Sequence, residues 1–485
     1  MTMTVKQGNP TVDLGRGGKA VFTGFAVILF AVVAVTGILR DTDQFPGILA
    51  GLSIYIASLL IPIYLVRNHA GWFHPLVFTS GFSLLQMVRR ASSYFDGMPQ
   101  HAGIPGYASS DLNALIWQLL LIQTLAQLAY YLGYIVGPKK PQSIFVPGSA
   151  DPSSRVLLVF ALVVVFFVAF LRNKGGLADH MVDLGQGRVR QIEENQMFGI
   201  SVVVVNLSMF MLLILVAIAR TPFHYLLVAI IAPAVMFMKY TAAGSRSSMI
   251  FAMILCLMVR SLATRRIRWS LYFGGAVAAI IAIGALGQIR RGTWKGAEGL
   301  DEALSSMTAS DSFGNGLSEL EQRGSALNPV YAIMARVPDE VPYLLGESYI
   351  TLFTMPIPRA LWMNKPRTTG ALVGPTFFDS NAGAPPGPIG EALWNFGLPG
   401  VVLAYLLFGA FHRYMQMLFL NNSASPVIIA VYALTLLNLQ PDVLSIVNWV
   451  QIALVGYVVC RLFGIVHRRR VSRPNLTPRL QPTVR

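Results

Sequence analysis

Residues 199–219 read GISVVVVNLSMFMLLILVAIA, an uninterrupted stretch without a single Asp, Glu, Lys or Arg. About 20 mainly apolar residues in an α-helix are enough to cross the hydrocarbon core of a bilayer. Backbone N–H and C=O groups find no water in that core, so they must be hydrogen-bonded within the segment itself. The stretch therefore predicts a transmembrane helix.

The same pattern recurs along the whole chain. We expect twelve membrane spans, at residues 20–39, 47–66, 72–88, 113–136, 155–171, 199–219, 223–238, 247–262, 269–288, 398–420, 425–440 and 446–466. The sequence thus predicts an all-α integral membrane protein with about 12 transmembrane helices and one large extracytoplasmic loop. It divides into an N-terminal membrane part with nine spans (1–288), the loop (289–397), three C-terminal spans (398–466) and a basic cytoplasmic tail (467–485).

The composition agrees with a membrane protein. Of the 485 residues, 54% are hydrophobic and only 12% are charged, and the mean hydropathy is +0.58. Soluble domains carry about 25% charged residues. The net charge of +15 does not indicate nucleic-acid binding, because the basic residues gather in loops on one side. The two cysteines, Cys256 and Cys460, lie in apolar runs and form neither a disulfide framework nor a metal-site pattern.

The loops also predict an orientation, because Lys and Arg accumulate in cytoplasmic loops. With both termini in the cytoplasm, 20 basic residues fall on or nearest the cytoplasmic side and 9 in the short external loops. Of the 22 acidic residues, only Asp13 and Asp151 are then cytoplasmic. A cytoplasmic active site would have almost no carboxylates, so we expect any chemistry on the outer face.

Several arginines contradict the usual bias. Arg89, Arg90, Arg246, Arg290 and Arg291 lie at the outer ends of predicted spans. Guanidinium groups bind phosphate with two hydrogen bonds, and a helix N-terminus adds its own amides. Gly244-Ser245-Arg246-Ser247-Ser248 combines both features at the start of a span. These residues predict a site for a lipid diphosphate; the alternative is that they bind phospholipid headgroups or pair with nearby acids.

The 109-residue loop 289–397 is too long to be a simple connection. Apolar residues at helical spacing predict amphipathic helices over Ala326–Val337 and Ser348–Leu361. Trp362 and Trp394 offer flat faces for stacking on sugar rings, although tryptophan also anchors helices at membrane interfaces. Glu391, just before a span, is a candidate general base, because desolvation raises the pKa of a carboxyl group. Its alternative role is helix capping.

At these residues the chain resembles the O-antigen polymerase family, the oligosaccharide repeat-unit polymerases of bacterial envelopes. The resemblance rests on the multi-span plan with a late external loop and on Pro358-Arg359, with Trp362 and Lys365-Pro366 downstream. It also rests on Arg359 standing ten residues from Gly370, on the Gly390-Glu391…Asn395-Phe396-Gly397 stretch, and on the Gly-Ser-Arg-Ser element before an earlier span.

The resemblance implies a membrane fold like that of the glycosyltransferase C class, in a bacterial plasma (inner) membrane. It implies a glycosyltransferase that is metal-independent, needs no cofactor and uses a polyprenyl-diphosphate-linked glycan as donor. A chain-length regulator protein is an implied partner. A leaving diphosphate requires positive charge, for which the candidates are Arg246, Arg290, Arg291 and Arg359, with Arg89 and Arg90. Glu391, Arg359 and Arg246 form the expected catalytic set, and Asp311, Glu193 and Glu194 are further candidates for the base.

Two rival functions remain open from the sequence. A ligase that moves the finished glycan to an acceptor belongs to the same superfamily, whose ligases carry a histidine in the large external loop. Loop 289–397 contains no histidine, and the external histidines are His101 and His180. A lipid-linked oligosaccharide flippase or transporter would place ionisable residues inside spans and show repeated halves. The sequence has no carboxylate near the middle of a predicted span and no evident repeat.

Overall fold

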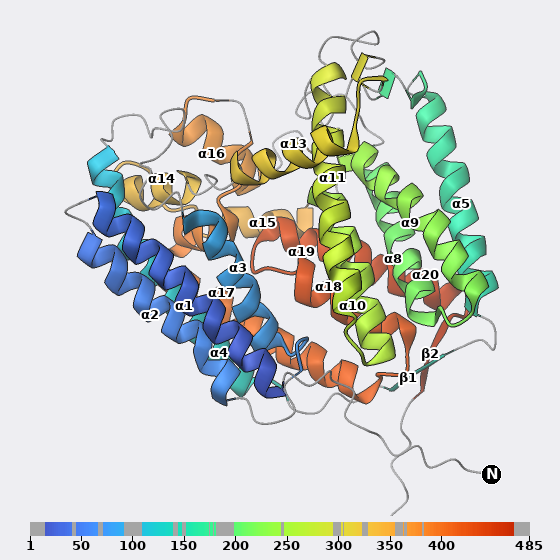
Figure 1. Cartoon of the computed structure of the whole chain (residues 1–485), viewed down its shortest axis with the longest axis horizontal. Helices are drawn as coiled ribbons and strands as arrows, with labels where there is room; N and C mark the ends of the chain where they lie inside the picture. Colours follow the sequence, from blue (N-terminus) through green and yellow to red (C-terminus); the bar gives the residue numbers. More distant parts are fainter. Residues whose placement is uncertain are drawn as a thin grey trace, which may run out of the picture.

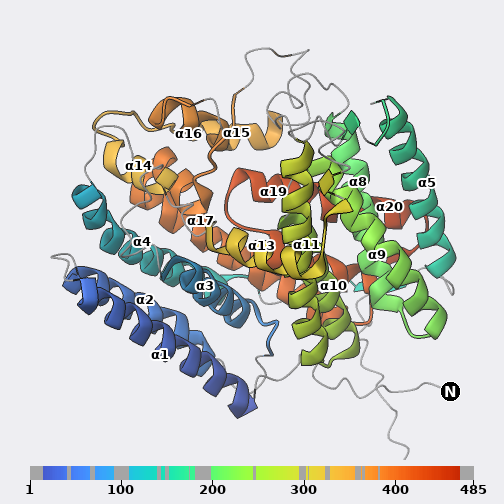
Figure 2. The same ribbon diagram turned by 45° about the horizontal axis from the view of Figure 1, so that its top comes forward.

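The structure is a computed structural model, and its description covers the helices and the better-defined loops. The described residues are 15–40, 45–65, 71–91, 109–138, 144–147, 152–173, 175–177, 179–180, 198–243, 247–293, 302–303, 305–322, 328–354, 362, 366–380 and 383–469. Within them the chain is helical apart from two short strands. Figures 1 and 2 show two groups of long helices that diverge from each other, with short helices across the wider end.

The first group is built around two long helices and three companions (Figure 1). Its members are α1 (Gly15–Arg40), α2 (Phe45–Leu65), α3 (Pro75–Ala91), α4 (Ser109–Val136) and α17 (Gly387–Asn421). Helices α4 and α17 pack with their backbones in contact, because glycines face each other. A Cβ at Gly133 would overlap the carbonyl oxygen of Leu406, and one at Gly409 would overlap that of Tyr130.

The second group holds the largest apolar core. Its long helices are α5 (Pro152–Asn173), α8 (Phe198–Ile218), α9 (Pro222–Ala243), α10 (Ser247–Thr264) and α11 (Trp269–Thr293). Helix α8 includes all but the last residue of the apolar stretch 199–219. It is buried from Ser208 to Leu215. It contacts α5, α9, α10 and α18 and is therefore the centre of the group rather than a lipid-facing helix.

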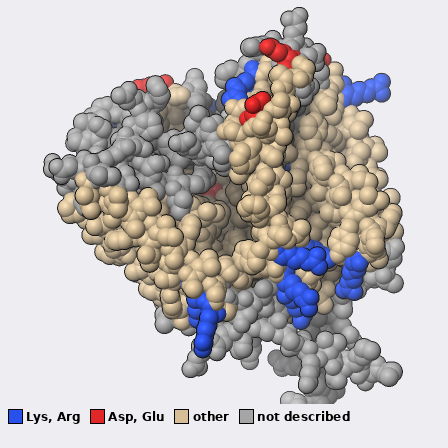
Figure 3. All heavy atoms as spheres, in the orientation of Figure 1, with Lys and Arg blue, Asp and Glu red and all other residues tan. Residues whose placement is uncertain are grey.

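The C-terminal part forms a helical hairpin between the two groups (Figure 2). It consists of α18 (Pro426–Asn438), the turn 439–442, α19 (Val443–Trp449), the π-helix η4 (Val450–Leu454) and α20 (Val455–Leu462). The turn lies at the inner end of the hairpin, so its residues reach the region between the groups. Figure 3 shows that the surface is hollowed there, with a small acidic patch inside the hollow.

Eight helices are long and apolar enough to cross a membrane, which agrees with an integral membrane protein. Three further apolar helices are shorter: Val203–Ile218, Met249–Thr264 and Pro426–Asn438. Each of the twelve expected spans coincides with helical structure, but the third, α3, is neither one of the eight long apolar helices nor one of the three shorter ones. The all-helical membrane architecture is confirmed, and the count of twelve stays a prediction.

Four short helices of the 289–397 segment lie at the wider end of the molecule (Figure 1). They are α13 (Ala309–Gln322), α14 (Asn328–Arg336), α15 (Glu347–Thr354) and α16 (Thr369–Phe377). Two of them, α14 and α15, fall within the two expected amphipathic segments; residues 355–361 lie outside the described part of the chain. The segment is thus a folded cover rather than an extended loop.

The opposite end of the molecule carries basic residues. Strand β1 (Ile144–Pro147) pairs antiparallel with β2 (Val466–Arg469), which joins the segment after α4 to the segment after α20. Arg260, Arg265, Arg266 and Arg268 lie at the turn between α10 and α11. On the face shown in Figure 3, the visible Asp and Glu are in the upper part, and Lys and Arg alone mark the lower end. Lys and Arg are also visible in the upper part of this face, so it is the acidic side chains that are confined to one end (Figure 3).

Candidate functional site

Glu391 lies on α17, six residues before the point where this helix is broken. Gly397 has the non-helical angles φ 65° and ψ −151°, and Pro399 follows it. The break separates an upper half, Gly387–Phe396, from a lower half, Leu398–Asn421. The predicted start of the tenth span at residue 398 coincides with this break. The upper half is therefore free to point its polar side chains toward the covering helices and the hairpin turn.

The carboxyl group of Glu391 is buried, with only 2% of the residue exposed. Its Oε2 accepts a hydrogen bond from the backbone N–H of Val443, the first residue of α19, at 3.0 Å. Its Oε1 is also buried and has no hydrogen-bond partner among the described residues. One carboxyl oxygen is thus fixed by the protein, while the other retains its capacity to accept a hydrogen bond or a proton.

Asn395, one turn after Glu391, ties three segments together. Its Nδ2 donates to the Oγ of Ser348 on α15 and to the backbone oxygen of Glu391, both at 2.8 Å. Its Oδ1 accepts from the backbone N–H of Gly346 at 3.0 Å. Ser348 and Thr369 place hydroxyl groups beside the Glu391 carboxyl. We call these five buried residues, Ser348, Thr369, Glu391, Asn395 and Asp442, the carboxyl cluster.

Asp442 is the second carboxyl group of the cluster; like Ser348 and Thr369, it was not among the candidate site residues chosen from the sequence. It caps α19: Oδ1 accepts from the backbone N–H of Ser445 and Oδ2 from the Ser445 hydroxyl, both at 2.8 Å. Burial raises the pKa of Asp442, and the hydrogen bonds from Ser445 and Leu444 oppose that rise. An Asp followed three residues later by Ser at the start of an apolar run is a recognisable N-cap. Nothing in that pattern reveals its proximity to Glu391.

Tyr349 completes the surroundings of the cluster. Its ring stacks on Phe396 at a centroid distance of 6.3 Å. Burial raises the pKa of the Tyr349 hydroxyl, and the carboxyl groups of Glu391 and Asp442 raise it further. The hydroxyl consequently stays protonated and can serve as a hydrogen-bond donor near the two carboxyl groups.

Tight packing fixes the upper half of α17. A Cβ at Gly390 would lie 3.3 Å from Val330 on α14, and one at Gly400 would lie 2.6 Å from the carbonyl oxygen of Ala392. Trp394, which we expected to stack on sugar, is 2% exposed and meets Phe377 edge-on at 5.0 Å. It packs as a core residue here, and its sugar contact stays a prediction. Trp362 is 41% exposed, as a stacking platform requires.

The six predicted phosphate-binding arginines are described to different extents. Arg246 and Arg359 lie outside the described residues, as do Glu193 and Glu194. Arg89 and Arg90 end α3, and Arg290 lies in the last turn of α11; for these three only the backbone is described. The ends of α3 and α11 both lie toward the covering helices (Figure 1). Arg291 is exposed and is described through its side chain.

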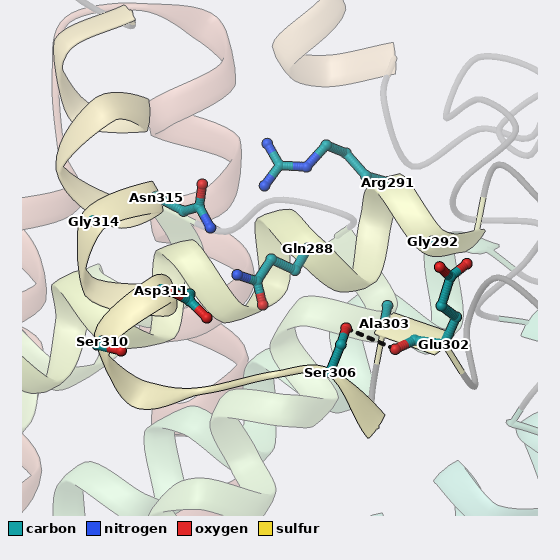
Figure 4. Close-up of a pocket in the computed structure, with 10 residues that line it drawn as sticks. All are labelled: Gln288, Arg291, Gly292, Glu302, Ala303, Ser306, Ser310, Asp311, Gly314 and Asn315. Atoms are coloured by element: carbon teal, nitrogen blue, oxygen red, sulfur yellow. Dashed lines mark hydrogen bonds between the residues drawn. The ribbon is translucent and has the colours of Figure 1, made fainter.

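Arg291 lines a second feature, a cavity of about 730 Å³ between α11 and α13. Its lining residues are Gln288, Arg291, Gly292, Glu302, Ala303, Ser306, Ser310, Asp311, Gly314 and Asn315. Figure 4 shows Gln288 and Arg291 extending from α11 toward the side chains of Asp311 and Asn315 on α13. The structure thus brings together two residues selected from the sequence, Arg291 and Asp311, that stand 20 positions apart.

The described residues contain no group of three or more His, Cys, Asp or Glu that could hold a metal ion. The carboxyl and hydroxyl groups of the cluster can accept and donate hydrogen bonds and protons.

A comparison with protein families gives one match that spans nearly the whole chain. A family model described as O-antigen polysaccharide polymerase Wzy matches residues 21–464. No curated protein and no solved structure matches significantly. The matched region includes the carboxyl cluster, both groups of long helices and the covering helices.

Proposed function

Because the chain belongs to the O-antigen polysaccharide polymerase family, we propose that it joins lipid-linked repeat units at the carboxyl cluster, with Glu391 as general base. The chain polymerises O-antigen repeat units in a membrane, and membership of this family does not favour the ligase or flippase alternatives. Beyond family membership we propose a specific glycan donor, the residues that act on it and the side of the membrane on which they lie.

In the proposed reaction the donor is a glycan attached to a polyprenyl diphosphate. The bond between its anomeric carbon and the diphosphate oxygen breaks, and the diphosphate leaves with the bonding electron pair on its lipid. A hydroxyl oxygen of a second lipid-linked repeat unit forms the new glycosidic bond to that carbon. The hydroxyl proton passes to the carboxylate of Glu391. A positioned general base contributes about 10²- to 10⁴-fold to such a rate.

One observation carries the assignment of Glu391: its two carboxyl oxygens are not equivalent. Oε2 is held by the Val443 N–H, whereas Oε1 has no protein partner in the described structure. A buried polar atom without a partner costs about 1–3 kcal/mol. The hydroxyl groups of Ser348 and Thr369 lie beside the same carboxyl group, and in our proposal Oε1 is the oxygen that accepts the proton of the substrate hydroxyl.

The leaving diphosphate requires positive charge, which the outer arginines can supply. We assign this role to Arg246, Arg290, Arg291 and Arg359, together with Arg89 and Arg90, and we place Arg246 and Arg359 in the catalytic set. Guanidinium groups form paired hydrogen bonds to phosphate oxygens and stabilise the charge that develops there. We therefore expect polymerisation by the purified protein to continue in the presence of EDTA.

The side of the membrane follows from the charge distribution. The end with β1, β2 and the basic turn after α10 faces the cytoplasm in our proposal, together with both termini. The covering helices α13 to α16 then face outward, in the bacterial inner membrane, where lipid-linked repeat units and a chain-length regulator can reach them. Trp362 is the exposed candidate for stacking on a sugar ring, and Trp394 would require a rearrangement of the core to do so.

The decisive experiment complements a deletion strain with Glu391→Gln. The amide retains an oxygen to accept the Val443 N–H but cannot take a proton. We expect polymer to fall by at least about 100-fold, with single repeat units still reaching the acceptor. Glu340→Gln is the matched control, because Glu340 is an exposed partner of Arg336 at the end of α14. Long chains at the wild-type level from Glu391→Gln, at equal protein amount, would remove Glu391 from the reaction.

A further inference from the structure

The cavity between α11 and α13 belongs to a rigid part of the molecule. A Cβ at Gly284 on α11 would overlap the backbone oxygen of Ser312, and a Cβ at Gly316 on α13 would overlap that of Ile280. Two helices whose backbones touch at two glycines cannot slide or separate without losing the contact. The two walls of the cavity that α11 and α13 supply are therefore held in a fixed relation, and Glu302, Ala303 and Ser306 from the segment between the helices complete the lining.

The lining of this cavity combines polar and apolar surface in similar amounts and carries both signs of charge. Its ionisable residues are Arg291, Glu302 and Asp311, so they sum to a net negative charge of about one at neutral pH. The interior therefore does not suit a second anion such as a phosphate. The other lining residues supply two amides, two hydroxyl groups and one methyl group, with backbone alone at two glycines: they are Gln288, Asn315, Ser306, Ser310, Ala303, Gly292 and Gly314. Such a surface suits a neutral ligand with many hydroxyl groups.

Two of the lining residues have unused hydrogen-bonding capacity. Gln288 is half-buried, and its amide makes no hydrogen bond to another described residue. Arg291 forms no ion pair or hydrogen bond within the described part of the chain. Asp311 accepts a hydrogen bond from Thr308 at Oδ2, at 2.6 Å, which fixes its carboxyl and leaves acceptor positions on both oxygens. Gln288 and Arg291 on α11 and Asp311 on α13 thus present donors and acceptors to the cavity from two helices in close contact (Figure 4).

We propose that this cavity is a carbohydrate subsite that holds a sugar of the lipid-linked repeat unit, next to the diphosphate that Arg291 binds at the rim. The inference rests on the proposed function for the identity of the substrate. A volume of about 730 Å³ lies within the range of small-molecule sites. The diphosphate and its attached sugar are adjacent in the substrate, and the cation and the polar cavity are adjacent in the protein.

Gly314 provides a way to fill the cavity without disturbing the helix. It lines the cavity, and a Cβ there would meet nothing within 4 Å. Gly314→Phe therefore places a ring in the space of the sugar. Gly274 on α11 is the matched control: its Cβ is equally unobstructed, but it does not line the cavity. Gln288→Leu is a second, smaller change that removes hydrogen bonds while retaining the shape of the cavity.

The test uses full-length protein in lipid nanodiscs and two probes. The first is the host's own repeat-unit oligosaccharide, released from its carrier, and the second is inorganic pyrophosphate. We expect Gly314→Phe to raise the oligosaccharide Kd at least tenfold and Gln288→Leu to raise it severalfold, with Gly274→Phe unchanged. Pyrophosphate binding should weaken in Arg291→Gln and persist in Gly314→Phe. The subsite would be overturned if Gly314→Phe bound the oligosaccharide as tightly as the wild type. It would also be overturned if Gly314→Phe lost pyrophosphate binding while it kept oligosaccharide binding.

Glu391→Gln separates this inference from the proposed function. If both are correct, Glu391→Gln binds the oligosaccharide with the wild-type Kd and does not polymerise. If Glu391→Gln polymerises normally while Gly314→Phe fails to bind, the base is wrong and the subsite holds. If Gly314→Phe binds normally and Glu391→Gln is inactive, the base holds and the subsite is wrong.

Discussion

The two halves of α17 bury polar side chains in different ways. In the lower half, Arg413 donates from Nη1 to the hydroxyl of Tyr134 on α4 at 2.9 Å, and that hydroxyl also bonds Gln416 and lies 3.2 Å from Nε2 of His74. In the upper half, Glu391 and Asn395 bond instead to the first residue of α19 and to Ser348 on α15. The lower network joins two long helices, whereas the upper one joins short segments.

Of the two polar networks, only the upper one has the features of a functional site. The lower network contains no carboxyl group and lies where α4 and α17 touch through Gly133 and Gly409. It therefore serves to hold two spans in register. The upper network contains two carboxyl groups, one of them with an unpartnered oxygen, and its partners come from the cover of the molecule. Variants in the two halves should therefore separate folding from polymerisation.

The largest effect is expected from Gly409→Leu in the lower half. The new side chain would overlap the backbone of Tyr130, and a backbone cannot move aside as a flexible side chain can. Overpacking costs about 1–3 kcal/mol even where side chains can adjust, so we expect folded protein to disappear from detergent extracts by size-exclusion chromatography. Gly24→Leu on α1, where a Cβ meets nothing, should retain the wild-type yield. Normal yield of Gly409→Leu would show that α4 and α17 are not in contact.

A smaller but more specific effect is expected from Asn395→Leu in the upper half. The substitution removes three hydrogen bonds and leaves the Gly346 N–H without its acceptor. An unsatisfied buried group costs about 1–3 kcal/mol, so the protein should unfold at a lower temperature. Polymerisation per folded molecule should fall by more than about tenfold, because a misplacement of about 1 Å can cost 100-fold. Unchanged activity per folded molecule would show that Asn395 does not position Glu391.

Tyr134→Phe provides the counterpart in the lower half. It deletes the hydroxyl that Arg413, Gln416 and His74 share, so the stability should fall by about 1–3 kcal/mol. Polymerisation per folded molecule should nevertheless stay within twofold of the wild type. The measurement is the same pair of thermal unfolding and in vitro polymerisation assays. A large loss of activity at unchanged stability would show that the lower network takes part in polymerisation rather than only in folding.

Much of this architecture could be predicted from local sequence. Apolar runs with at most one charged residue located every long helix, and the boundary at residue 398 was predictable because Gly397 and Pro399 interrupt the span. Glu391 could be selected because it is an acid beside a Gly/Pro-rich turn. The identity of its partner was not predictable, since Val443 is 52 residues away and contributes only a backbone N–H, which every residue except proline possesses.

The sequence was least informative where tertiary contacts decide exposure. Trp394 was expected from the sequence to stack on a sugar ring at the surface, but its own ring lies against Phe377 in the core. Asp442 looked like an ordinary loop acid between two spans, because the hairpin turn that buries it depends on how α18 and α19 pack. Arg291 and Asp311 could each be selected, yet their meeting in one cavity depends on Gly284 and Gly316, two small residues with no chemical signal of their own.

The smallest effect should come from Asp442→Asn, which tests the electrostatics of the carboxyl cluster. Burial raises the pKa of Asp442 above its unfolded value of about 4. A carboxyl whose pKa is raised by folding contributes stability that is present at low pH and is lost as pH rises through the folded-state pKa. Asparagine can still cap α19 through its oxygen, so the variant lacks only this pH-dependent term.

We therefore expect the wild type to lose stability relative to Asp442→Asn as the pH rises from about 4 toward 7, by about 1 kcal/mol or less. Thermal unfolding of both proteins in nanodiscs across that range measures the difference, and Asp339→Asn, at an exposed position, should track the wild type. The opposite trend, in which the wild type gains on Asp442→Asn with rising pH, would mean that the Ser445 hydrogen bonds outweigh burial. Asp442 would then be a stable anion beside Glu391, and the upper half of α17 would carry a fixed negative charge at its site.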